Sequence, residues 1–453
     1  MTSSGEHTFY VILMRKSHFS IAQRHTPQRR YKQLTCVDNS MTTANENDDP
    51  DKRTPSPADW FRRIGLRFDP YVHLEASSDP HLPEYTVNLD IFRVALDDVP
   101  TIIVAPPGGG KTAMRVAVTQ TCWFDIGGMY PFPLPYNLGM APLTGKPPTA
   151  TQHLHLLLEA GTCALLTGLA FRPERLLRTS DATIRATAAI LRAGLPGPLD
   201  YYLTILRETG TPARLTPLLE RTYALTAPPP SDVVNLFCDA LADPGVDAMR
   251  GQAEDIFQAF VEMVTGALGF SHVLLLIDGI DAMYENQADV QNAAGWVFDL
   301  FDRAEAWTRS NTFIKLFLPD LMEPVVIDYL HRHAIAARVA HIVWNHDLLV
   351  NMLQKRISAA SEERFESLDA ISTPALTDVE RRIVANLPPL PRVALQVTRQ
   401  ALLHYAARLD NGGQLDEDDI HHAIAWYRRH AAQQPLASHV YSRSRSNASA
   451  RRN

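Results

Sequence analysis

The segment that most constrains the fold of this chain is an apolar stretch that runs into a glycine-rich turn, Thr101-Ile-Ile-Val-Ala-Pro-Pro-Gly-Gly-Gly-Lys-Thr112. The apolar residues predict a buried strand at 100–104, and a helix should begin inside the turn and run to about Thr121. Such a turn aims consecutive backbone N–H groups and a helix N-terminus at one point, which suits a phosphate group. The segment therefore predicts a strand–loop–helix unit that binds phosphate.

The turn is similar to the pattern G-x-x-x-x-G-K-[ST], with Ala105 in place of the first glycine. In that pattern the lysine, here Lys111, reaches the β- and γ-phosphates, and the following hydroxyl, here Thr112, binds Mg²⁺. An alanine at position 105 restricts the backbone without obstructing the turn that starts at Gly108. We therefore predict a P-loop that binds ATP with Mg²⁺, and GTP stays open as an alternative. The predicted nucleotide-binding residues are Ala105, Pro106, Pro107, Gly108, Gly109, Gly110, Lys111, Thr112 and Ala113.

A second apolar strand, predicted at 273–277, ends in the acidic segment Asp278-Gly-Ile-Asp281. Because parallel strands end at the same edge of a sheet, Asp278 is predicted to stand beside the Mg²⁺ ion. We interpret Asp281 as the acid that orients the attacking water, with Glu285 behind it. The alternative interpretation is that Asp281 caps the following helix.

The order of the predicted elements indicates an α/β fold, a P-loop-type parallel sheet with flanking helices. Two more strands are expected at 131–138 and 312–318, and helices are expected at 151–169, 254–268 and 288–306. Strands that alternate with helices favour a largely parallel sheet. We assign this core to residues 59–341, with a helical insertion at about 173–250.

The chain from residue 342 to residue 435 is predicted to be a separate, all-helical lid domain. Its helices are expected at 347–357, 378–384, 392–408 and 417–428. Residues 1–58 and the basic tail at 436–453 are polar and offer little to bury, so we expect both to be disordered. Met41 opens a sequence typical of a protein start, which leaves open whether residues 1–40 are native.

The charge distribution argues against nucleic acid as a partner. The formal net charge is −7, but residues 1–40 and 436–453 each carry a net charge of +4. Residues 41–435 hold 33 basic and 48 acidic residues, a net charge of −15, which repels a phosphate backbone. The four cysteines are scattered, so neither a disulfide framework nor a zinc site is expected. We find no run of about 20 apolar residues, and so expect a cytoplasmic protein without a membrane span.

Together these segments resemble the AAA+/STAND group of P-loop ATPases, in particular bacterial AAA-like ATP-binding proteins. The Asp278-Gly-Ile-Asp281 ending is similar to the NACHT-type pattern. It departs from ordinary AAA+ enzymes, which have a glutamate where this chain has Gly279, and from NACHT domains, in which an acid often stands where this chain has Ala282. The resemblance covers about residues 60–430.

Four shorter segments extend the resemblance. Residues 312–318 stand where the sensor-1 strand of the group lies, and Trp344–Ile357 resembles the first lid helix. Leu390-Pro-Arg392 is similar to the sensor-2 motif, which implies that Arg392 reaches the γ-phosphate. Phe68–Tyr71 is similar to the start of a short box that precedes the P-loop. The alternative for Arg392 is a solvated residue at a helix start, and for Trp344 an ordinary core position.

The resemblance implies a regulatory or signalling ATPase in which the nucleotide state moves the lid. The predicted catalytic residues are Lys111, Asp278, Asp281 and Arg392, and the predicted metal ligands are Thr112 and Asp278. A protein partner is expected to bind the insertion at 173–250, and the chain is a candidate for homo-oligomer formation. The alternatives are a non-hydrolysing nucleotide-binding scaffold, which the missing glutamate favours, a DNA-associated ATPase resembling replication initiators, and a small-molecule kinase.

Overall fold

The computed structural model of the chain describes residues 57–87, 89–124, 130–140, 147–212, 215, 229–283, 290–408 and 413–431. The N-terminal segment expected to be disordered lies outside these residues, except for its last two, and so does the basic tail. Glu285 also lies outside them. The expectations for these parts of the chain stay predictions.

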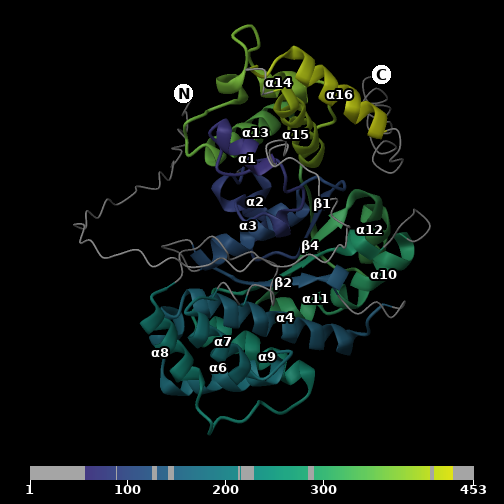
Figure 1. Cartoon of the computed structure of the whole chain (residues 1–453). Helices are drawn as coiled ribbons and strands as arrows, with labels where there is room; N and C mark the ends of the chain where they lie inside the picture. The colour runs from purple at the N-terminus through teal and green to yellow at the C-terminus, as the bar shows by residue number, and fades with distance from the viewer. Residues whose placement is uncertain are drawn as a thin grey trace, which may run out of the picture. The chain divides into compact units, whose positions relative to one another are not determined.

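A parallel sheet lies at the centre of the described part of the chain (Figure 1). Its spatial order is β2-β3-β4-β1-β5, and its strands are β1 (Thr101–Ala105), β2 (Phe132–Asn137), β3 (Val273–Asp278), β4 (Thr312–Pro319) and β5 (Arg338–His341). Strands β1, β3 and β4 are buried along their whole length, which explains why they are largely apolar in the sequence, with the buried Lys315 as an interruption in β4. The predicted α/β class with a parallel sheet is confirmed.

Strand β5 was not predicted from the sequence. It lies at the edge of the sheet beside β1, with Thr101 opposite Arg338, and its two end residues are exposed. A short edge strand with polar ends lacks the apolar run that marks a buried strand. By pairing in parallel with β1, β5 brings the chain to the end of β1 just before the C-terminal helices begin.

Helices cover the sheet and connect its strands, as expected for parallel pairing. The helix predicted at 288–306 is divided in two in the structure. The connecting helices near the sheet are α2 (Ile91–Leu96), α3 (Lys111–Phe124), α10 (Val290–Phe301), α11 (Ala304–Arg309) and α12 (Glu323–Arg332). Short 3-10 turns follow the carboxyl ends of β2, β3 and β4 at η4 (Leu138–Met140), η7 (Ile280–Met283) and η9 (Asp320–Met322).

Helix α4 (Ala150–Phe171) begins at a capping box, in which the Thr149 hydroxyl and the Gln152 side chain each accept a bond from the other residue's backbone N–H. By length and mean hydropathy α4 could cross a membrane, although polar residues interrupt its apolar sequence. However, 78% of its apolar window is buried inside the protein, where α4 packs on β2 and on α9 (Ala253–Glu262). Core helices show the same apolar composition.

The described residues of the segment expected as an insertion form helices that share one hydrophobic core with α4, the sheet and the next helix, Ala253–Glu262. Leu203 and Phe237 of this segment and Phe260 of the next helix are fully buried. In Figure 1 these helices lie beyond α4, at the opposite end of the view from α13–α16. The helices are α5 (Glu174–Leu177), α6 (Asp181–Gly194), α7 (Leu199–Thr209), α8 (Ser231–Leu241) and α9 (Ala253–Glu262), which continues into a π-helical turn at Met263–Ala267.

The C-terminal helices have a hydrophobic core of their own, and the beginning of the described chain contributes to it. Trp60 and Phe61 of α1 (Pro57–Arg63), together with Tyr71, are buried there. We call this unit the helical bundle: α1, α13 (His346–Ala360), η10 (Leu368–Ile371), α14 (Val379–Val384), α15 (Pro391–Arg408) and α16 (Glu417–Ala431). Residues near Trp60, assigned from the sequence to the α/β core, therefore pack with the helices expected at 342–435.

A buried ion pair anchors the segment 68–87 to α13. The Arg356 guanidinium lies 3.1 Å from the Asp79 carboxylate and donates to the carbonyl oxygen of Pro70 at 2.8 Å. It also lies 4.1 Å from the ring centre of Tyr85, whose hydroxyl donates to Asp79. Because both charges are buried and hydrogen-bonded to each other, removing either one would leave the other uncompensated. The pair fixes the segment, including the turns η2 (Ala76–Ser78) and η3 (Leu82–Glu84), against the bundle.

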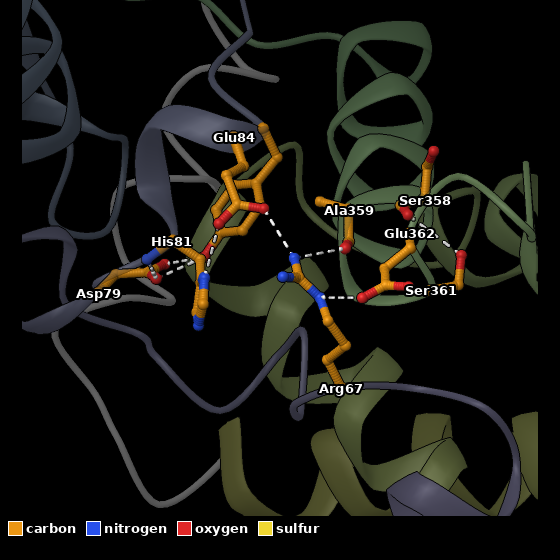
Figure 2. A network of polar contacts seen from close by, with 9 residues as sticks. Arg67, Asp79, His81, Glu84, Ser358, Ala359, Ser361 and Glu362 are labelled. Carbon is orange, nitrogen blue, oxygen red and sulfur yellow. Dashed lines mark hydrogen bonds and ion pairs between the residues drawn. The ribbon is translucent and has the colours of Figure 1, made fainter. Parts of the chain in front are cut away.

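A more exposed group of contacts links the same segment to the end of α13 (Figure 2). Arg67 donates to Glu84 at 3.0 Å and to the carbonyl oxygen of Ala359 at 3.2 Å, and it lies 3.6 Å from Glu362. His81 contacts Glu84 at 2.8 Å. Exposed ion pairs contribute little stability individually. Their effect here is to orient the segment against α13.

Glu380 of α14 is a buried acid whose carboxylate accepts a hydrogen bond from the Leu368 N–H at 2.7 Å. Burial raises its pKa from 4.5 to about 7. Since the pKa is higher in the folded state, protonation of Glu380 stabilises the fold fully below pH 4.5. That contribution is lost as the pH rises through 7.

We expect Glu380→Gln to raise the thermal unfolding midpoint at pH 8 by several degrees, about 2 kcal/mol, because a neutral amide avoids burying a charge. At pH 5 the wild-type carboxyl is already protonated, so the variant should melt close to the wild type. Circular dichroism melts at the two pH values check this. Equal shifts at pH 5 and pH 8 would show that the charge of Glu380 has no part in the effect.

Candidate functional site

The turn after β1 needs glycine at three successive positions. Gly108 and Gly110 have φ angles of +77° and +94°, which residues with a Cβ atom rarely adopt. A Cβ atom on Gly109 would lie 2.8 Å from the carbonyl oxygen of Pro106. Ala105 belongs to the end of β1 and precedes the turn, so the alanine at the first position of the motif does not disturb it.

The first turn of α3 carries the two residues predicted to bind phosphate and metal. The first N–H groups of a helix have no intrahelical partner, and the helix dipole is positive there. The Lys111 ammonium donates to the carbonyl oxygens of Ala105 at 3.1 Å and Pro106 at 3.3 Å. Lys111 is only 5% exposed. The structure therefore holds a buried positive charge inside the loop, at the start of α3.

Strand β3 ends with Asp278 directly beside Thr112. The Thr112 hydroxyl donates to Asp278 Oδ2 at 2.8 Å, and the Gly279 N–H donates to Oδ1 at 2.8 Å. Asp278 is 3% exposed. The predicted metal ligands thus lie together at the carboxyl edge of the sheet, and hydroxyl and carboxylate oxygens are ligands that Mg²⁺ prefers.

Gly279 is required by the backbone and by its neighbour. Its φ angle is +83°, and a Cβ atom there would lie 2.0 Å from Oδ1 of Asn137. Asn137 ends β2 and is paired in register with Asp278. A larger residue at position 279 would have to adopt this positive φ angle and displace the Asn137 side chain.

Asp281 lies in the turn η7 and points back toward the loop. Its carboxylate is 3.6 Å from the Lys111 ammonium, and its side chain is 39% exposed. The alternative that Asp281 caps the following helix stays open, because residues 284–289, between its turn and Val290 of α10, lie outside the described residues. Asp320, after β4, is a further acid near Lys111. Burial raises the pKa of Asp320, and the positive charge of Lys111 opposes that rise.

Two residues of the bundle side contact consecutive carbonyl groups of the loop. The Trp344 indole N–H donates to Gly109 O at 2.9 Å, and the Arg392 backbone N–H donates to Gly108 O at 3.4 Å. A Cβ atom on Gly108 would lie only 2.9 Å from the Cβ of Arg392. Arg392 is exposed overall, although its base packs on the loop. Both contacts are made to carbonyl oxygens of the loop, so neither of them occupies a loop N–H group.

A cavity of about 550 Å³ lies over the loop, in the size range of small-molecule sites. At one end it is lined by the loop, the start of α3 and Asp278. At the other end it is lined mainly by apolar side chains of the segment 68–87, its continuation to α2, and the bundle. Those apolar residues include Leu74, Leu82, Val87, Leu89, Phe92, Met352 and Leu395.

The residues around Asp278 fit a magnesium ion that is shared with a phosphate. Among the described residues, no group of three or more His, Cys, Asp or Glu side chains could hold a metal ion by itself. Mg²⁺ in nucleotide sites is often held by one or two carboxylates, substrate phosphates and water. The pair Thr112–Asp278 is therefore sufficient only when a phosphate group supplies further oxygens.

Sequence reasoning missed three residues of the site. Arg115 follows Lys111 by four residues and Thr112 by three, so helical spacing places it on the same face of α3, and this signal was available. Asn137 was recognisable only as a polar residue at the end of a strand. Trp344 was expected to begin the first lid helix, with an ordinary core position as the alternative, because no sequence pattern indicates that its indole reaches a carbonyl group 235 residues earlier in the chain.

Comparisons with known proteins give no relative from which a function could be transferred. No family model matches the sequence, no curated protein matches it, and no solved structure matches the fold. The function must therefore be argued from the geometry of the site.

Proposed function

We propose that this protein is a P-loop ATPase that binds ATP with Mg²⁺ and whose helical bundle acts as a lid over the nucleotide. The observation that carries the proposal is the convergence of the glycine loop, Lys111, Thr112 and Asp278 at one end of a cavity of about 550 Å³. Positive charge, unpaired helix N–H groups and an oxygen pair for the metal are what a triphosphate requires.

The apolar end of the cavity suits the nucleobase. A purine ring is flat and largely apolar on its faces, and Leu82, Val87 and Leu395 offer surfaces of that kind. The nucleotide would then contact the loop through its phosphates and the bundle through its base. This arrangement explains why the segment 68–87 is anchored so firmly to α13.

Isothermal titration of the full chain with ATP, GTP and ADP in the presence of Mg²⁺ tests the proposal. ATP should bind at one site per chain, and phosphate release in the same solution should report any turnover. A chain that binds none of the three nucleotides would refute the proposal. Preferential binding of GTP would support the P-loop assignment but would show that the preferred base is guanine and not adenine.

A non-hydrolysing nucleotide-binding scaffold is the second candidate function. The absence of a glutamate after Asp278 favours it, and the crowding of Gly279 against Asn137 opposes a larger residue at that position. In the ATPase proposal Asp281 must orient the attacking water. ATP binding without phosphate release would select the scaffold.

The contacts of the bundle with the loop support the proposed lid motion. Trp344 and Arg392 hold the carbonyl groups of Gly109 and Gly108, so a loop that shifts around a γ-phosphate would shift these contacts too. The expectations of a protein partner at 173–250, of a homo-oligomer and of a cytoplasmic location stay predictions, as does the unlikelihood of a nucleic-acid partner.

We expect Arg392→Ala to retain ATP binding within about tenfold but to lose the ATP-dependent protection of residues 340–392 from limited proteolysis. The exposed Arg392 side chain is the group that would sense the γ-phosphate. The matched control is Arg399→Ala, which removes an arginine of the same helix that pairs with Asp69 instead. Equal ATP protection in Arg392→Ala and in the wild type would assign Arg392 a structural contact only.

A further inference from the structure

Asp278 already has a cationic partner from its own chain. Arg115 Nε donates to Asp278 Oδ2 at 3.1 Å, and this oxygen is the one that accepts the Thr112 hydroxyl at 2.8 Å. The two side chains are 2% and 5% exposed. The acid predicted to attract a divalent cation is thus paired with a buried guanidinium.

Arg115 contacts Asp278 from outside the lining of the cavity. Thr112 and Asp278 line the cavity, whereas Arg115 is not among the residues that line it. Arg115 therefore does not reach a ligand directly, and it influences the cavity through the carboxylate that it holds. A guanidinium keeps its charge at all relevant pH values, so this influence is permanent.

The charge of Arg115 has two opposite effects on a nucleotide. It repels a divalent cation that approaches Asp278, because two positive charges a few ångströms apart interact strongly in a site shielded from water. The charge of Arg115 also attracts the phosphates. It acts together with the charge of Lys111, one turn earlier on α3, and with the positive end of the helix dipole. Both effects reduce what Mg²⁺ contributes to nucleotide affinity.

We propose that Arg115 is a positioning residue that neutralises Asp278 from within the chain, so that the P-loop binds a nucleoside triphosphate with little dependence on Mg²⁺. The inference rests on the proposed nucleotide site. It adds that Asp278 is already neutralised before Mg²⁺ binds. It implies that the protein can load the free nucleotide before the metal arrives.

The test measures the affinity for ATP by isothermal titration, once with Mg²⁺ and once with excess EDTA, in the wild type, Arg115→Met and Arg115→Lys. In the wild type the two dissociation constants should differ by less than about tenfold. In Arg115→Met the ratio should grow by at least about tenfold, since loss of the cation frees Asp278 for the metal. Arg115→Lys keeps a positive charge and should keep the wild-type ratio.

If the role of Arg115 is purely structural, Arg115→Met should lower the stability, or lower the ATP affinities with Mg²⁺ and with EDTA by the same factor. The ratio of the two affinities would then stay unchanged, which would overturn the inference. A wild-type affinity that falls by a hundredfold or more in EDTA would overturn it without any variant, so the test holds even if Arg115→Met does not fold. If ATP binds in neither buffer, the proposed function fails. If ATP binds and only the ratios disagree, the P-loop assignment stands and the role of Arg115 does not.

Discussion

Lys111→Ala should weaken ATP binding by more than about 100-fold, because it removes the buried positive charge that faces the phosphates. The Lys111 ammonium donates to the carbonyl groups of Ala105 and Pro106 and lies 3.6 Å from the exposed Asp281, so it is held where a phosphate would replace these contacts. Isothermal titration with ATP and Mg²⁺ measures the loss.

The matched control is Arg381→Ala, which removes one positive charge from an exposed ion pair with Asp347 on the bundle surface. Its ATP affinity should equal that of the wild type, because an exposed charge is screened by water and salt. An unchanged affinity in Lys111→Ala, with the control also unchanged, would remove the loop from the nucleotide site.

The two acids after β3 should respond differently to replacement by asparagine. Asp278→Asn should reduce Mg²⁺-dependent turnover by more than about 100-fold and remove any gain in affinity from Mg²⁺, because the metal loses its carboxylate. It should also lower stability, since the buried ion pair between Arg115 and Asp278 would be lost. Phosphate release and thermal melts measure the two effects.

Asp281→Asn should slow turnover about 100-fold while ATP binds within about threefold of the wild type. The carboxylate of Asp281 is exposed and forms a loose pair with Lys111, so its contribution to binding is small. Asparagine is itself a good helix cap, which means that a residue with a purely structural role would tolerate the change. Normal turnover in Asp281→Asn would exclude Asp281 from the reaction and favour the scaffold.

The sequence predicted the sheet well where burial left a clear pattern. Strands β1, β3 and β4 are buried at every position, and their residues are apolar except for the threonine that starts β1, the threonine that starts β4, the buried Lys315 within β4 and the Asp278 that ends β3. Edge strand β5 carries no such pattern. The loop, Lys111, Thr112 and Asp278 could be placed together because the carboxyl ends of parallel strands meet at one edge.

The contacts that the sequence could not predict join residues far apart in the chain. Nothing in the sequence around Trp60 distinguishes packing on the sheet from packing on helices near residue 400. The same holds for Trp344 and Gly109, and for Asn137 and Gly279. Such pairings depend on the three-dimensional arrangement of whole elements, whereas periodicity reports only which face of one element is buried.

The packing of α1 in the bundle core means that two separate stretches of chain tie the bundle to the sheet. One runs from Tyr71 to β1, and the other runs from β5 to α13. A domain that is attached by one stretch of chain can move in any direction. A domain that is attached by two stretches rotates about the line that joins the two attachment points. We therefore expect the proposed movement of this bundle to be a rotation about one axis rather than a free opening.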